Sequence, residues 1–322
     1  MRSRLLAAAL LTTSCAASPE RADADEGLGE DELRASRIET VAAMPLPIVE
    51  VSGLGQRRVS GVTEYLAVGD ASSTLVSFTV ESGDHVADVR THDLSRLFGK
   101  RASQWEAVAG DGAGRVFVLA ESTDTLSVLA PDLTRVTHRL RIAIPKKHEL
   151  AAAWKADANS RGEGLVLLAN GHVLVAKEKR PSAILELGPK GAVAEGYRPE
   201  LALGDRAFPL PEEGDGDLVP LAHWLLKDKD TRLLGDVSDL AVDAEGRLFL
   251  LSDQGRAVAR VERTLDVGES KIDLKAVYAL PPRVAKPEGL TFADGRAFVA
   301  TDGKDVRADA LFALEPLDAE RD

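Results

Sequence analysis

Short apolar runs, separated by turn residues, recur along most of the chain. Five segments share one pattern: a Ser or Glu, one further residue, a Leu or Val, a turn, and an apolar run that ends in Asp or Glu. These segments are residues 51–70, 105–121, 162–178, 237–253 and 287–302. The runs are too short for helices and are rich in Val, Leu and Phe, so they predict strands buried on both faces.

Turn and strand signals extend each segment into a larger unit. Asn170-Gly171 and Asp294-Gly295 lie between apolar runs, which is a strong hairpin signal. A third apolar run follows each terminal acid, at residues 75–80, 126–129, 183–187, 257–261 and 311–314. A fourth run follows in three of the units, at residues 86–91, 136–144 and 274–280.

Four strands per unit, repeated along the chain, predict the blades of a β-propeller. We therefore expect an all-β fold in a single domain over residues 38–316, with a short tail at 317–322. Five blades are favoured, and the strand expected at residues 38–44 would complete the fifth blade and close the ring. Surplus residues centred on 203–232, with a helix expected over 223–229, leave a sixth, degenerate blade as the alternative.

The repeat also predicts two rings of polar residues on one face of the propeller. The inner ring, at the channel mouth, is Ser52, Glu106, Glu163, Ser238 and Glu288. The outer ring is Asp70, Glu121, Glu178, Asp253 and Asp302. Carboxylates that converge on a channel repel one another unless a cation lies among them, and oxygen ligands suit Ca²⁺ or Mg²⁺. Glu106, Glu163 and Glu288 are therefore the candidate metal ligands, whereas we expect the outer acids to hold turns by accepting backbone N–H bonds.

The N-terminus carries the features of an export signal. Arg2 and Arg4 precede an apolar run at residues 5–11 and the small residues before Cys15. This arrangement resembles the lipobox of bacterial lipoproteins, a resemblance that implies lipidation of Cys15; an ordinary signal, cleaved near residues 16–18, is the alternative. The acidic residues 16–37 predict a flexible tether. We expect an exported protein, either lipid-anchored to the outer membrane or cell surface, or periplasmic.

Composition narrows the set of partners. The chain has 52 acidic and 40 basic residues and a net charge of −12, which argues against nucleic acid as a partner. The sequence has no run of about 20 apolar residues that could span a membrane, so we expect membrane contact through the lipid anchor only. A single cysteine excludes an intramolecular disulfide. We expect a monomer.

Several motifs resemble a known family. Arg161-Gly-Glu-Gly-Leu165 and Lys286-Pro-Glu-Gly-Leu290 are similar to the repeats of the SdiA-regulated propellers and the related esterase-like-phytase propellers, over roughly residues 45 to 315. The resemblance implies a periplasmic or surface-exposed propeller that binds calcium in or near its channel. Two departures leave the inner ring incomplete in carboxylates: Ala107 replaces Gly in the second unit, and Ser238-Asp239 replaces Glu-Gly in the fourth.

Two classes of function follow. The first is a binding or scaffolding module for an envelope protein, a glycan, or a small anionic ligand held through a metal. The alternative is a metal-dependent hydrolase of phosphoesters, for which several basic residues lie near the outer acids: Lys177, Lys179, Arg180, Arg256, Lys304 and Arg307. A lactonase is less favoured, because only Asn159 and Asn170 could join acids on a metal. No catalytic residue is assigned, and no cofactor besides Ca²⁺ is expected.

Overall fold

The computed structural model describes residues 35–317 except 100, 102, 158 and 213. All of these residues belong to one compact unit, Leu33–Asp322. The predicted signal segment with Cys15, the tether up to residue 34 and the tail from residue 318 lie outside the described residues. Residues 35–37, which the sequence assigned to the tether, form a short strand.

The strands pair in antiparallel sets of four, and the all-β prediction is confirmed. The first set is β3 (Val51–Val59), β4 (Val62–Gly69), β5 (Thr74–Glu81) and β6 (His85–Asp93). The second is β7 (Trp105–Gly110), β8 (Val116–Ala120), β9 (Thr125–Leu129) and β10 (Val136–Ile142). The third is β11 (Leu165–Leu167), β12 (Val173–Lys177), β13 (Ala183–Pro189) and β14 (Asp215–Leu226).

The last two sets involve the N-terminal strands as well. The fourth set is β15 (Asp239–Val242), β16 (Leu248–Ser252), β17 (Ala257–Val261) and β19 (Leu274–Ala279), with β1 (Ala35–Arg37) parallel to β19. The fifth is β20 (Pro287–Ala293), β21 (Arg296–Thr301), β22 (Leu311–Leu314) and β2 (Thr40–Met44). The remaining described elements are β18 (Lys271–Ile272), paired with β14, and the helices α1 (Ser95–Phe98), α2 (Ala151–Ala156) and α3 (Asp228–Leu234).

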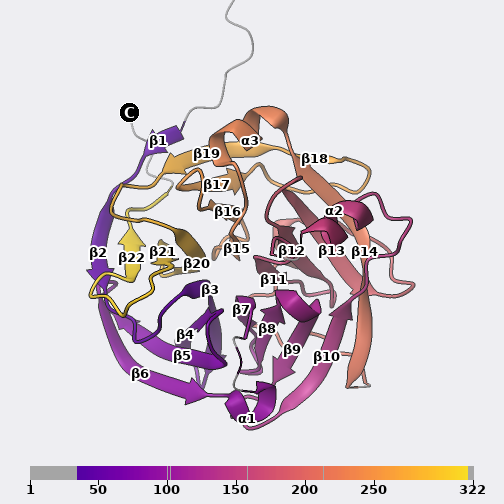
Figure 1. Cartoon of the computed structure of the whole chain (residues 1–322). Coiled ribbons are helices and arrows are strands. Elements are labelled where there is room, and N and C mark those ends of the chain that lie inside the picture. Colours follow the sequence, from indigo (N-terminus) through magenta and orange to yellow (C-terminus); the bar gives the residue numbers. More distant parts are fainter. Residues whose placement is uncertain (1–34, 100, 102, 158, 213, 318–322) are drawn as a thin grey trace, which may run out of the picture. The chain divides into compact units, whose positions relative to one another are not determined.

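The sets stand around a common axis, with the first strand of each set innermost (Figure 1). The innermost strands neighbour one another in a closed circuit: β3 lies against β7, β7 against β11, β11 against β15, β15 against β20, and β20 against β3. Five apolar clusters within the described residues fill the spaces between neighbouring sets. This is the arrangement expected of propeller blades. The preference for five blades over six stays a prediction.

The N-terminal strand closes the ring, as the sequence predicted. Strand β2 pairs antiparallel with β22, from Thr40 opposite Leu314 to Met44 opposite Leu311. At the junction between the fifth and first sets, the ring of Phe298 lies edge-on to Tyr65, with 5.5 Å between centroids. The outer strand of the last set thus comes from the opposite end of the chain.

The surplus residues of the third unit differ from their prediction. The helix expected over residues 223–229 is wrong for 223–226, which belong to β14, and α3 begins only at Asp228. In this segment residues 223–225 pair with β13 on one edge and residues 225–226 pair with β18 on the other, and Trp224 is completely buried. Pairing on both edges outweighs the local helical preference of a short segment. Tyr197, just before the surplus segment, donates a hydrogen bond from its hydroxyl to the carbonyl of Gly246, 2.7 Å away, in the turn of the fourth set.

Candidate functional site

A pocket of about 270 Å³ opens where the innermost strands begin. We call it the acidic pocket. Its lining contains the carboxylates of Glu50, Asp70, Glu106, Glu121, Glu163, Glu178, Glu288 and Asp302. The other described residues that line it are Val51, Ser52, Gln104 and Asn159, so the described lining has no Lys, Arg or His.

The three candidate metal ligands come together here. Glu106 is on β7, Glu288 is on β20, and Glu163 lies just before β11, so three of the five innermost strands bring these side chains to one pocket. The two serines at equivalent positions have another role. Ser52 donates its hydroxyl hydrogen bond to the carbonyl of Trp105, and Ser238 donates to the carbonyl of Pro287 at 2.9 Å. Each serine therefore links the start of its own innermost strand to that of a neighbour.

Four of the five outer acids line the same pocket, whereas Asp253 does not. From the sequence, only the inner ring was expected at the channel mouth. Each outer acid follows the second strand of its set, which is about 4.8 Å from the first. That spacing is short enough for an Asp or Glu side chain beside the inner strand to reach the same space.

The outer acids are held in different ways. Glu121 accepts the backbone N–H of Arg161 at 2.7 Å, and Asp70 accepts the N–H groups of its own residue and of Ala71. Glu178 instead accepts a hydrogen bond from the Lys179 ammonium at 2.5 Å, and Asp302 from the Lys286 ammonium at 2.6 Å. One carboxylate oxygen each of Asp70, Glu178 and Asp302 is buried without a hydrogen-bond partner in the structure. Such oxygens are the positions at which a cation would be accepted.

Burial and mutual repulsion change the acidity of the pocket. Burial, reinforced by the surrounding carboxylates, raises the pKa of Glu106 and of Glu288 to about 9. The same causes raise the pKa of Glu163 well above its ordinary value. Burial also raises the pKa of Glu121 to about 7, against the opposing effect of hydrogen bonds from the Arg161 backbone and from Glu163. Near neutral pH several of these groups therefore hold protons, because so many carboxylates cannot ionise side by side.

The donor chemistry fits a hard cation, although the carboxylates are spread around the pocket. Among the described residues, no group of three or more His, Cys, Asp or Glu is placed so that it could hold a metal ion directly. Ca²⁺ accepts six to eight oxygens, and some of these are commonly waters. A water occupies about 30 Å³ in the liquid, so the pocket has room for an ion with part of its hydration shell.

Immediately beyond the acidic pocket the innermost strands approach one another closely. A Cβ atom added at Gly53 would lie 2.9 Å from the Cα of Ala107, and one at Gly289 would lie 2.8 Å from the backbone N of Leu54. At these two positions the glycine after the inner Ser or Glu therefore packs directly against a neighbouring innermost strand. Side chains larger than glycine do not fit at these close approaches without a shift of the backbone.

Asp239 fills the equivalent position in the fourth unit. Its carboxylate is buried and accepts the N–H groups of Leu240 and Leu290, each at 2.7 Å, and also that of Leu54. Three innermost strands are thereby joined at the axis. The departure Ser238-Asp239 was visible in the sequence, where it was interpreted as a missing metal ligand. Its structural role depends on the backbone N–H groups of two other innermost strands, which no local pattern reveals.

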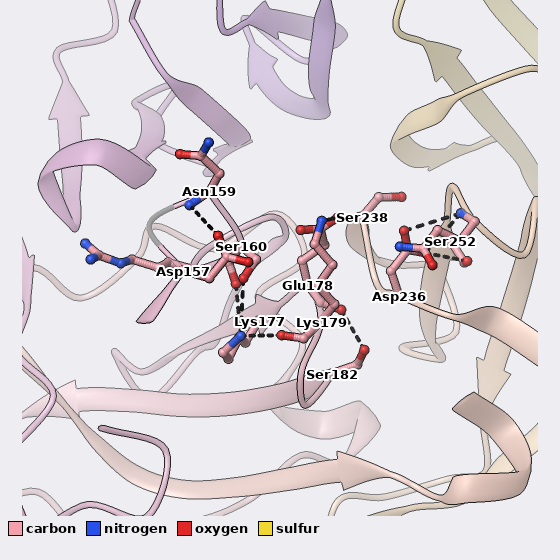
Figure 2. A network of polar contacts seen from close by, with 12 residues as sticks. Asp157, Asn159, Ser160, Lys177, Glu178, Lys179, Ser182, Asp236, Ser238 and Ser252 are labelled. Atoms are coloured by element: carbon pink, nitrogen blue, oxygen red, sulfur yellow. Dashed lines mark hydrogen bonds and ion pairs between the residues drawn. The ribbon is translucent and has the colours of Figure 1, made fainter. Parts of the chain in front are cut away.

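The basic residues considered for phosphate binding do not line the acidic pocket. Lys177 is fully buried, and its ammonium donates to the carbonyl of Lys179 and lies 3.4 Å from both Ser160 oxygens (Figure 2). Burial lowers the pKa of Lys177. The contacts of Lys177 join the segment before β11 to the turn after β12, which is a structural role.

None of the helices in the described part of the chain is long and apolar enough to cross a membrane.

Comparison with protein families decides the classification. A model of the SdiA-regulated family matches residues 50–300, which is more than half of the chain. The chain belongs to the SdiA-regulated family. The resemblance noted in the sequence is thus confirmed, and all residues of the acidic pocket except Asp302 lie within the matched region.

One solved structure supports the fold of this SdiA-regulated protein, and a second is similar to it at a lower score. Glutaminyl cyclase of Myxococcus xanthus superposes with a TM-score of 0.52 at 14% identity, covering 88% of this chain and 98% of the cyclase. The PQQ-bound aldose sugar dehydrogenase of Streptomyces coelicolor gives a TM-score of 0.47 at 11% identity, covering 88% and 99%. None of the curated proteins compared with the chain matches it. At such identities the cyclase shows the fold alone, which is a β-propeller.

Proposed function

We propose that this protein is a binding module whose acidic pocket holds a divalent cation, with Ca²⁺ as the best fit. One observation carries the proposal: eight carboxylates face one pocket whose described lining has no basic side chain, and three of them have a buried oxygen without a partner. A bound cation would supply those partners and relieve the repulsion among the carboxylates.

Protons compete with the cation for the same oxygens. The raised pKa values of Glu106 and Glu288 mean that cation binding must release protons at neutral pH. Cation affinity should therefore increase with pH across the range in which these groups ionise. This dependence distinguishes binding in the acidic pocket from binding by ordinary surface carboxylates, which are ionised throughout that range.

The proposed setting is the cell envelope. It is supported by the basic start, the apolar run and Cys15 of the N-terminal sequence. A cation held by protein oxygens on one side and by water on the other could exchange its waters for oxygens of a partner. A glycan, an acidic group of an envelope protein or a small anion would suit this role.

We favour binding over hydrolysis. Phosphoester hydrolysis requires basic groups that stabilise the phosphate as well as a metal. The described lining of the acidic pocket supplies carboxylates, Ser52, Gln104 and Asn159, and the hydroxyl of Ser52 is engaged with the carbonyl of Trp105. Hydrolysis of phosphoesters or lactones remains the alternative that the experiment below tests.

The test is a Ca²⁺ titration of the chelator-treated protein, by calorimetry and by thermal unfolding. We expect Ca²⁺ to raise the melting temperature, more strongly at pH 8 than at pH 6, because fewer protons must be displaced. The double substitution Glu163→Gln/Glu288→Gln should abolish the rise. Glu149→Gln/Glu245→Gln is the matched control, since these side chains are 63% and 64% exposed and lie outside the pocket.

An unchanged rise in the Glu163→Gln/Glu288→Gln variant would refute the proposed site. Phosphatase and lactonase substrates are tested on the same preparation. Turnover that requires Ca²⁺ and is lost in this variant would favour the hydrolase.

A further inference from the structure

A second pocket, of about 410 Å³, has the opposite charge to the acidic pocket. We call it the basic pocket. Lys179, Arg180 and Lys271 line it, and Asp228 is the one carboxylate among its described lining residues. Such a concentration of positive charge is unexpected in a chain with a net charge of −12.

Two of these three cations have no carboxylate partner among the described residues. Arg180 lies in the turn between β12 and β13, and Lys271 is the first residue of β18; both side chains are exposed. Arg180 has a φ of 55°, a left-handed conformation that costs a non-glycine residue roughly 1 kcal/mol or more. The fold holds this guanidinium at the basic pocket in spite of that cost. Unpaired cations around a concave site are the basis of oxyanion recognition.

The rest of the wall supplies polar groups and apolar surface. The side-chain amide of Gln254 lies close to Gly235, and both residues line the basic pocket. The hydroxyls of Ser182 and Thr231 donate to the carbonyls of Glu178 and Lys227, so their own oxygens are fixed in place. Leu225 and Leu226 form an apolar side of the pocket. A ligand with one anionic end and a short carbon framework would match this distribution.

An ion pair links the two pockets. Glu178 lines the acidic pocket and Lys179 lines the basic pocket, and the ammonium of Lys179 lies 2.5 Å from Oε1 of Glu178 (Figure 2). The other carboxylate oxygen of Glu178 is buried without a hydrogen-bond partner. A cation that binds to Glu178 would compete with Lys179 for the negative charge of Glu178, which would leave the ammonium freer to contact an anion.

We propose that the basic pocket binds a small oxyanion, a carboxylate, sulfate or phosphate group, and that this binding is coupled through Lys179 to cation binding in the acidic pocket. The anion site stands on the geometry of the basic pocket alone, whereas the coupling rests on the proposed cation site. Each ion should increase the affinity for the other by the same factor, because such linkage is reciprocal. The ligand class that satisfies both pockets is an organic anion presented together with a divalent metal.

The first test is calorimetric titration with sodium sulfate, and separately with sodium phosphate, in the presence of a chelator. We expect saturable binding to the wild-type protein, weakened at least about tenfold by Lys271→Gln and further by Arg180→Gln/Lys271→Gln. Lys275→Gln is the matched control, because Lys275 is an exposed lysine on β19 that pairs with Glu262 and does not line the basic pocket. Equal affinities in the wild type and Lys271→Gln, with both folded by circular dichroism, would overturn the anion site, as would the absence of saturable binding.

The second test repeats the sulfate titration with saturating Ca²⁺. We expect at least about fivefold tighter binding, the lower end of typical coupling between sites. The increase should be lost in Lys179→Met, which removes the charge that both pockets share, while Ca²⁺ still binds. Equal sulfate affinity with and without bound Ca²⁺ would overturn the coupling. Sulfate binding in a protein that takes up no Ca²⁺ would refute the proposed cation site and leave the anion site standing.

Discussion

Replacing Glu288 by glutamine tests the energetics of the acidic pocket directly. Glu288→Gln removes one ionisable group from β20 and keeps the size of the side chain. In the folded protein without a cation, burial and neighbouring acids raise the pKa of Glu288 from 4.5 to about 9. The unfolded chain has no such environment, so the same side chain ionises there at its ordinary pKa.

The difference in pKa sets the expected change in stability. Because the folded-state pKa is raised, the penalty is absent below pH 4.5 and grows as the pH rises toward 9. Every pH unit above the ordinary pKa costs about 1.4 kcal/mol, so at pH 7 the wild type is destabilised by about 3 kcal/mol at this one residue. Glutamine does not carry that penalty. Glu288→Gln should therefore stabilise the cation-free protein by up to about 3 kcal/mol at pH 7, and by about 1 kcal/mol at pH 5.

The assay is urea unfolding in a chelator at several pH values between 5 and 8, followed by the same series in saturating Ca²⁺. In chelator the variant should gain stability over the wild type as the pH increases. At a Ca²⁺ concentration of about a hundred times the dissociation constant, the free energy of unfolding of the wild type should increase by about 2.7 kcal/mol. The increase should be smaller in the variant. A variant less stable than the wild type in chelator, or a difference that does not change with pH, would refute the reasoning.

Two other buried carboxylates should respond in opposite directions. Asp239→Ala leaves the N–H groups of Leu240 and Leu290 without their acceptor and should destabilise the fold by about 3 kcal/mol in urea unfolding, with Asp239→Asn intermediate. An Asp239→Ala variant as stable as the wild type would show that these bonds are dispensable. Asp230 on α3 is buried, both of its carboxylate oxygens lack a hydrogen-bond partner, and burial raises its pKa. Asp230→Asn should therefore raise the melting temperature at pH 7. The increase should become smaller as the pH falls toward 4, because the wild-type carboxylate is then increasingly protonated in both states. A lower melting temperature at pH 7 would instead indicate that the charge of Asp230 is stabilising.

The sequence predicted the features that repeat along the chain. The apolar runs at residues 257–261 and 311–314 coincide with β17 and β22, because strands buried on both faces are predominantly apolar. The closing strand at residues 38–44 was also predictable, since the fifth unit lacked a fourth strand. Glu106, Glu163 and Glu288 could be placed together because equivalent positions of a repeat occupy equivalent positions around the axis.

Other features depend on contacts that a local pattern does not contain. The segment at residues 223–226 has no clear strand period, and its pairing with β13 on one edge and β18 on the other determines its conformation. The sequence predicted separate inner and outer rings of acids, but neighbouring strands lie only about 4.8 Å apart, so four of the five outer acids line the same pocket as the inner ones. The basic pocket combines the turn after β12, the end of β14, α3 and β18, which lie up to about 90 residues apart in the chain.

The pairing of β2 with β22 has a consequence for the time course of folding. Residues 40–44 are among the first described residues of the chain, yet their partners, residues 311–314, are almost the last. Because the chain is synthesised from its N-terminus, β2 stays without its native partner until nearly every other strand has been made. Contacts so distant in sequence form slowly, and a waiting edge strand can pair with the wrong chain. We therefore expect the pairing of β2 with β22 to be a late step of folding, and one at which an unpaired edge strand is exposed to aggregation.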